Sequence, residues 1–186
     1  MRLWRVILTS STLAQAPVTV HVSQSLDSSS RLRTLLCDHF CATPVIVHPD
    51  EASVLAHVAN HSGDVGVLAS GSAWAAAFEA GLAGPASIMG VLPVLRDNPE
   101  PELLVIGHAA AQPTGEDETI VISDEPIPQI DALSSRWSLR SGTKHVTALE
   151  GFHSEADGVL AQLVRSHVTL GLKAAGHYPS PIEVKP

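Results

Sequence analysis

The stretch Glu102–Ser123, ELLVIGHAAAQPTGEDETIVIS, holds two short apolar runs that flank a polar segment. The runs LLVIG and TIVIS are rich in β-branched residues, as buried strands are, whereas QPTGEDE contains a proline, a glycine and three acidic residues. We therefore expect a strand, a linker and a second strand, with a boundary between two structural units. The expected division is residues 1–111, a linker over 112–117, and residues 118–186.

The composition predicts a folded chain with an acidic balance. Of 186 residues, 45% are hydrophobic, and 19 acidic against 11 basic side chains give a formal net charge of -8. The arginines are scattered and form no basic cluster, which argues against a nucleic-acid partner.

The beginning of the chain resembles a signal peptide only in part. In MRLWRVILTSSTLAQA, the apolar run VIL is interrupted at once by TSST, and no later run approaches the roughly 20 apolar residues that span a bilayer. Cys37 and Cys41 have no second pair to complete a zinc site, so we expect small buried thiols. Together these features predict a cytoplasmic protein.

Strands and helices alternate before the boundary. Apolar periodicity and capping residues predict, in order, a helix over 1–15, a strand over 18–23, a helix over 28–40, a strand over 44–48, a helix capped by Asp50, and a strand over 64–70. This order is typical of βαβ units, so we expect a small, mainly parallel sheet with covering helices.

A candidate polar pocket follows the third strand of this unit. Ligands bind at the carboxyl ends of strands in such sheets, and Ser70 and Ser72 lie in the loop directly after that strand. A serine that caps the next helix explains the same residues, and both interpretations stay open.

The pattern changes after the linker. The order strand, helix, strand, strand, helix, strand over residues 118–186 predicts a βαββαβ ferredoxin-like sandwich. A hairpin is expected around Gly142, where RWSLRSG and HVTALEGF pair.

This second half resembles an ACT domain, specifically the one at the carboxyl end of prephenate dehydratases. The resemblance also extends to the longer chorismate mutases of some proteobacteria, of which this chain would be the rear portion without the helical mutase domain. The matching strings are Leu3-Trp4-Arg5, Asp38-His39-Phe40, Leu103–Gly107, Pro113–Thr119, Ile120–Ser123 and Gly176-His177-Tyr178-Pro179.

The resemblance implies a regulatory or small-molecule-binding module of aromatic amino acid (phenylalanine and tyrosine) biosynthesis. Prephenate dehydratases carry a Thr-Arg-Phe motif where this chain has Pro101-Glu102-Leu103, so the hydroxyl and the cation of catalysis are missing and a dianionic substrate is repelled. We expect a catalytically silent protein. The alternative is an enzyme, either a chorismate mutase or a prephenate dehydratase.

The resemblance also implies an effector site, a homodimer and a helical mutase domain or partner. The expected ligand is an aromatic amino acid or another small molecule of the chorismate pathway, with no cofactor, no nucleic acid and no membrane. Its expected contacts are Ile127, Pro128, Gln129, Arg140 and Ser141. An exposed arginine on a hairpin is the simpler interpretation of Arg140.

Ten histidines raise the question of a metal site. His57 and His61 have the i, i+4 spacing of a helical ligand pair, but no acidic residue completes an HExxH motif. Both lie opposite the apolar face of their helix. We therefore interpret them as a solvated polar face and expect no metal site.

Overall fold

The computed structural model describes residues 17–96, 98–109, 112–128, 133–156 and 158–183. The helix expected over residues 1–15 lies outside these ranges. Every helix within them is too short or too polar to cross a membrane.

The first strands of the chain pair in parallel, as the βαβ pattern predicted. β1 (Val20–Ser23) lies between β2 (Val45–His48) and β3 (Val65–Ala69). The connections contain α3 (Ser30–Phe40) and α4 (Glu51–Asn60). Asp50 caps α4, because its Oδ1 accepts a hydrogen bond of 2.8 Å from the backbone N–H of Ser53.

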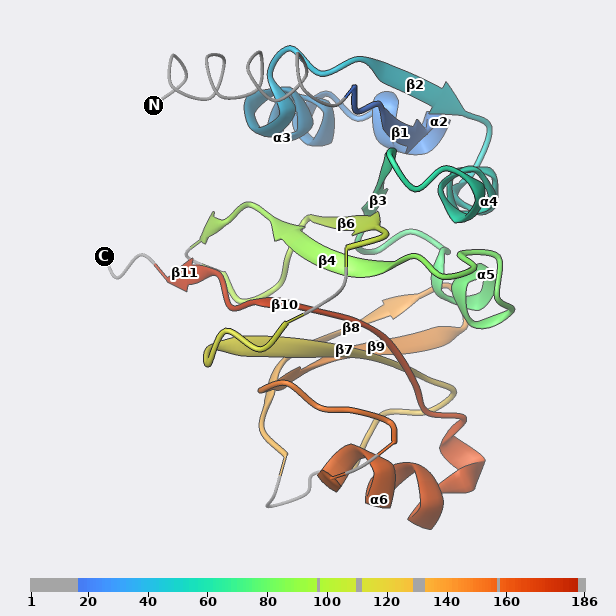
Figure 1. Cartoon of the computed structure of the whole chain (residues 1–186), viewed down its shortest axis with the longest axis vertical. Coiled ribbons are helices and arrows are strands. Elements are labelled where there is room, and N and C mark those ends of the chain that lie inside the picture. Colours follow the sequence, from blue (N-terminus) through green and yellow to red (C-terminus); the bar gives the residue numbers. More distant parts are fainter. Residues whose placement is uncertain (1–16, 97, 110–111, 129–132, 157, 184–186) are drawn as a thin grey trace.

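The later strands extend this unit into a single mixed sheet of nine strands. The sheet order is β2-β1-β3-β6-β4-β10-β7-β9-β8. In Figure 1 the strands from β2 to β10 follow one another along the long axis, and β7, β9 and β8 overlap in this view below β10. The added strands are β4 (Ser87–Leu92), β6 (Leu103–Gly107), β7 (Asp117–Ser123), β8 (Ser135–Ser141), β9 (Lys144–Glu150) and β10 (Lys173–Pro179). The short strands β5 (Leu95–Arg96) and β11 (Ile182–Glu183) form a separate parallel pair.

The expected fold class, a small mainly parallel sheet followed by a ferredoxin-like ACT domain, is therefore wrong. β6 runs antiparallel to both β3 and β4, so the sheet is mixed. β4 and β10 then pair in parallel through Ile88 and Gly176, which places strands from both sides of the expected boundary in the same sheet. The division at residues 112–117 stays a prediction.

Gly176 makes this junction possible. A Cβ atom at this position would lie 2.1 Å from the backbone oxygen of Ile88 and 2.5 Å from its nitrogen. The φ angle of Gly176 is +153°, which side chains disfavour. Glycine therefore allows two backbones to approach each other where the two halves of the sheet meet.

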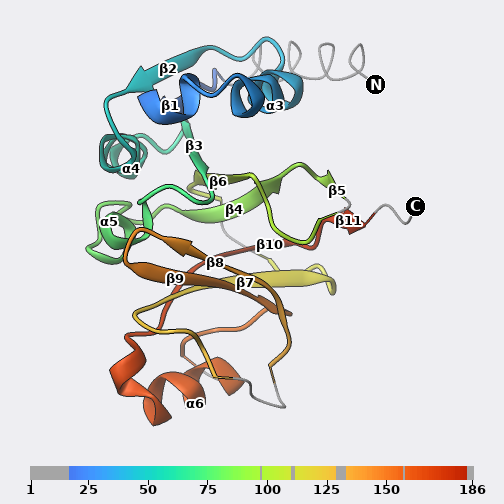
Figure 2. The same ribbon diagram turned by 180° about the vertical axis from the view of Figure 1, so that it is seen from behind.

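Helices cover both faces of the sheet (Figures 1 and 2). α4 and α5 (Ala75–Glu79) pack on one face, where Leu68, Ile120 and Ile122 contribute to their core. On the opposite face, α2 (Gln24–Asp27) and α3 cover the first strands, and α6 (Gly158–Ser166) covers β7 and β9. Side chains alternate between these cores along each strand, as in any sheet buried on both sides.

Candidate functional site: a histidine cluster beside β1

The three serines that were predicted to bind a ligand, Ser70, Ser72 and Ser141, lie close together near the carboxyl end of β3. The Ser70 hydroxyl donates to the carbonyl of Pro101 at 2.6 Å, and Ser72 lies in the same loop. Ser141, at the end of β8, donates to the carbonyl of Ser72 at 2.5 Å and accepts from the N–H of Ala75 at 3.0 Å. These hydrogen bonds join the loop after β3 to the far edge of the sheet.

The other predicted contacts lie elsewhere. Ile127 packs against the core beneath α6, Pro128 is exposed, and Gln129 lies outside the described residues. Arg140 is exposed on β8. The structure therefore brings Ser70, Ser72 and Ser141 together and leaves Ile127, Pro128 and Arg140 apart from them.

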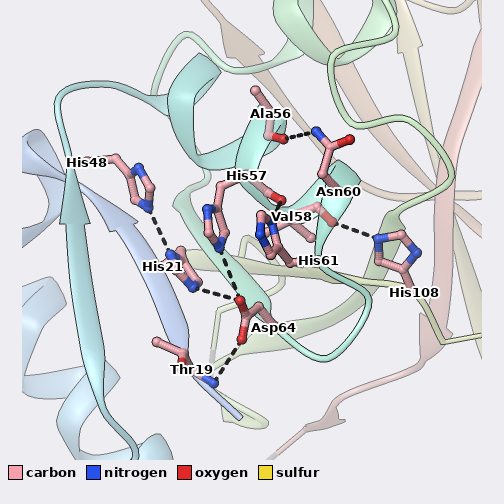
Figure 3. A network of polar contacts seen from close by, with 10 residues as sticks. All are labelled: Thr19, His21, His48, Ala56, His57, Val58, Asn60, His61, Asp64 and His108. Carbon is pink, nitrogen blue, oxygen red and sulfur yellow. Dashed lines mark hydrogen bonds and ion pairs between the residues drawn. The ribbon is translucent and has the colours of Figure 1, made fainter.

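A cluster of histidines forms a different site, between β1, β2 and α4 (Figure 3). Val20 and Val22 face the core under α3, so the alternation of the strand turns His21 toward α4. His48 ends β2 on the neighbouring strand, and His57 lies in α4 between the buried residues of that helix. We call His21, His48 and His57, together with Asp64, the histidine site.

The imidazole rings of the site lie in direct contact. His21 Nδ1 is 2.8 Å from His48 Nε2, and the rings of His21 and His57 stack with centroids 3.9 Å apart. His21, His48 and His57 each offer one ring nitrogen within 4.8 Å of the others. His61 stacks on the outer side of His57 at 4.0 Å, but its Nδ1 is 2.8 Å from the carbonyl of His57 in its own helix.

Asp64 supplies a carboxylate to the same cluster. Its Oδ2 lies 3.1 Å from His57 Nε2 and 3.2 Å from His21 Nε2, while its Oδ1 accepts a hydrogen bond of 3.3 Å from the N–H of Thr19. The contact with His57 has hydrogen-bond geometry, whereas the contact with His21 does not. His21 is 1% exposed, so its Nε2 is a buried polar atom without a hydrogen-bond partner.

The surroundings favour the neutral forms of His21 and His48 beside a charged carboxylate. Burial lowers the pKa of His21, and the nearby charge of His57 lowers it further; the same two causes lower the pKa of His48. Burial raises the pKa of Asp64, but the hydrogen bond from His57 and the charge of His21 outweigh it and leave the pKa below its ordinary value. Neutral imidazole and ionised carboxylate are the forms that bind metal ions.

The ring nitrogens of His21, His48 and His57 lie close enough together to share a metal ion, and Asp64 lies beside His21 and His57 without belonging to that group of three. With metal–ligand bonds of about 2.0–2.1 Å, tetrahedral coordination places neighbouring donor atoms about 3.3 Å apart. The two contacts of Asp64 Oδ2, at 3.1 and 3.2 Å, are close to this value. Three histidines and one carboxylate are also a donor set typical of zinc and related transition metals.

The interpretation of His57 and His61 as a solvated face describes only His61. His61 is exposed, whereas the His57 side chain is 26% exposed and contacts His21. The sequence did contain a signal for this site: two expected strands each carried a histidine, His21 and His48, and a neighbouring expected helix carried a third. Cys37 is exposed and Cys41 is half-buried, so the expectation of two buried thiols is also wrong.

A cavity of about 300 Å³ lies at the other end of the molecule. It is bordered by Glu118, Arg136 and Glu150, and Arg136 Nη2 lies 3.0 Å from Glu150 Oε1. Arg136 and Glu150 are paired with each other, Glu118 accepts hydrogen bonds from Trp137 and Tyr178, and the cavity is bordered by none of the residues predicted from the sequence.

Comparisons with known proteins identify no family. No family model and no curated protein matches the chain. A solved structure described as "GqqA- a novel type of quorum quenching acylases" is similar, with a TM-score of 0.49 and 12% sequence identity over 88% of this chain and 95% of that chain. A likeness of this degree assigns no activity to the present protein.

These findings correct the family and the function expected from the sequence. The similar structure is described as an acylase, and no prephenate dehydratase, ACT domain or chorismate mutase is found. The expected membership in that family is wrong. The expected role in aromatic amino acid biosynthesis, as a regulatory module or as an enzyme, is wrong for the same reason.

Proposed function

We propose that the protein binds one divalent transition-metal ion, with zinc as the first candidate, at the histidine site. His21, His48 and His57 provide imidazole nitrogens, and Asp64 provides a carboxylate oxygen. The observation that supports this most strongly is the approach of three ring nitrogens to within 4.8 Å of one another beside Asp64 Oδ2.

A purely structural role explains this arrangement less well. Packing three imidazoles against one another costs stability when two of them are protonated, because their charges repel, and protonation of His21 also places a charge in a buried position. An apolar side chain at position 21 would avoid that cost and would leave no buried ring nitrogen unpaired. A bound cation removes both costs, since it takes the nitrogen lone pairs and neutralises Asp64.

Metal titration of protein without a polyhistidine tag tests the proposal. Isothermal titration calorimetry with Zn²⁺ and Co²⁺ should give one equivalent bound, and bound metal should raise the melting temperature as mass action requires. His57→Ala should weaken binding by more than about tenfold, because it removes a direct ligand.

His61→Ala is the matched control. His61 follows the end of α4, one turn after His57, and its ring stacks on His57 without joining the cluster. This substitution should leave affinity unchanged. Absence of binding by the unsubstituted protein, or equal losses in His57→Ala and His61→Ala, would show that the metal proposal is wrong.

A cytoplasmic location and a homodimer remain proposals beside this one. The unpaired thiols of Cys37 and Cys41 support a reducing compartment. Sedimentation of the purified protein tests the homodimer directly.

A further inference from the structure

A second polar cluster lies where the chain changes direction across the sheet. From β1 the chain crosses to β2 on one side of β1 and then returns to β3 on its other side. The carboxyl ends of β1 and β3 therefore form a topological switch point. Crevices at such points bind ligands in open α/β sheets. Ser23 ends β1, Ser25 follows it, and Ser72 lies in the loop after β3.

Hydroxyl groups converge here on one carboxylate. Glu51 Oε1 accepts hydrogen bonds from Ser23 Oγ at 3.0 Å and from Ser25 Oγ at 2.7 Å. The Ser72 hydroxyl donates to the carbonyl of Ala69 at 2.9 Å and is also among the groups that lower the pKa of Glu51. Burial raises the pKa of Glu51, but hydrogen bonds from the Ser25 hydroxyl, from the backbone N–H of Glu51 itself and from the other serine hydroxyls outweigh burial and hold the pKa below its ordinary value.

Glu51 is not needed to cap α4. Asp50 already caps α4, and among the described residues no lysine or arginine forms an ion pair with Glu51. Ser23 is fully buried and Ser25 is exposed, so the cluster extends from the protein interior to the surface. The cluster has the chemistry of an anion-binding site whose anion belongs to the chain itself.

We propose that Ser23, Ser25 and Ser72 form a binding site for a carboxylate ligand, and that the Glu51 side chain occupies this site when no ligand is bound. A tethered carboxylate has a high effective concentration, so a free one competes with it weakly in the unsubstituted protein. Shortening Glu51 removes the competitor. Glu51→Ala deletes Cγ and the carboxyl group, and acetate contains the atoms that replace them.

The test compares acetate with acetamide on Glu51→Ala protein in the presence of EDTA, which prevents acetate from acting as a metal ligand. Glu51→Ala should lower the melting temperature, and acetate should restore it in a saturable manner. Acetamide, which has the same shape without the charge, and sodium chloride at equal ionic strength should not. The unsubstituted protein and Glu100→Ala, an exposed glutamate in a loop, should show no specific response to acetate.

Removing one donor provides the internal control. Ser25 is exposed, so the double variant Glu51→Ala/Ser25→Ala should still fold and should lose most of the acetate response. If Glu51→Ala is unfolded in the absence of acetate, the same comparison is made by circular dichroism on the recovery of folded protein. Equal effects of acetate and acetamide, or no effect of acetate on either readout, would overturn the proposal.

Discussion

Substituting Gly176 by alanine tests the junction that joins the two halves of the sheet. A Cβ atom at this position meets three backbone atoms of Ile88, at 2.1, 2.5 and 2.8 Å, and backbone cannot rotate away as a side chain can. The alanine must keep a φ that side chains disfavour, at about 1–3 kcal/mol, and β4 and β10 must also move apart and lose packing, at a further cost of about 1–3 kcal/mol. The expected loss of unfolding free energy is therefore about 2–6 kcal/mol.

Gly81→Ala separates the conformational cost from the steric one. Gly81 has a φ of +86° but no atom within 4 Å of a Cβ built there, so its substitution should cost only about 1–2 kcal/mol. Urea unfolding followed by circular dichroism measures both variants. If Gly176→Ala is no more destabilising than Gly81→Ala, β4 and β10 do not pack as described and the continuous sheet is refuted.

Two further substitutions test buried polar groups in the second half of the sheet. Tyr178→Phe should cost about 1.5–3 kcal/mol in urea unfolding, because it removes a hydroxyl that donates to the buried Glu118 carboxylate; unchanged stability would exclude that hydrogen bond. Asp117→Asn tests a carboxylate whose pKa is raised by burial but lowered further by hydrogen bonds from Thr114 and Gly115, so that it lies below the ordinary 3.8. The folded state therefore binds this proton less readily than the unfolded state, and the stability that Asp117 contributes is present above pH 3.8 and is lost as the pH falls through the folded-state pKa. The difference in unfolding free energy between unsubstituted protein and Asp117→Asn should be large at about pH 7 and small at about pH 3. A difference that does not change with pH would contradict this role of Asp117.

Local elements could be predicted from the sequence because their signals are local. Alternation placed β1, and Asp50 marked the start of α4 at the residue where the structure has it. The hairpin of β8 and β9 was also predicted, since Gly142 lies between them with a φ of +63°. Each of these signals lies within a few residues of the element that it specifies.

The arrangement of the sheet could not be predicted, because it depends on contacts between distant residues. Ile88 and Gly176 pair across the sheet, and a glycine indicates a close approach without naming its partner. A strand order of β-α-β-β-α-β was compatible with a separate sandwich, and no local pattern excluded the continuation of the sheet into β4.

The histidine site could not be predicted for a similar reason. His21 and His48 come together because β1 and β2 pair in parallel with Ser23 opposite His48, a register that the sequence does not specify. His57 was visible as part of a helical pair with His61, but α4 turns it toward β1. Only the folded chain shows that His57 stacks on His21 from the neighbouring strand.

X-ray absorption at the zinc edge tests the metal site most directly. In zinc-loaded protein, we predict the scattering pattern of imidazole rings with nitrogen and oxygen donors at about 2.0–2.1 Å, and its loss in His57→Ala. Sulfur scattering at about 2.3 Å would place the metal at Cys37 and Cys41 instead. That result, or a zinc spectrum that is the same in His57→Ala as in the unsubstituted protein, would contradict the account.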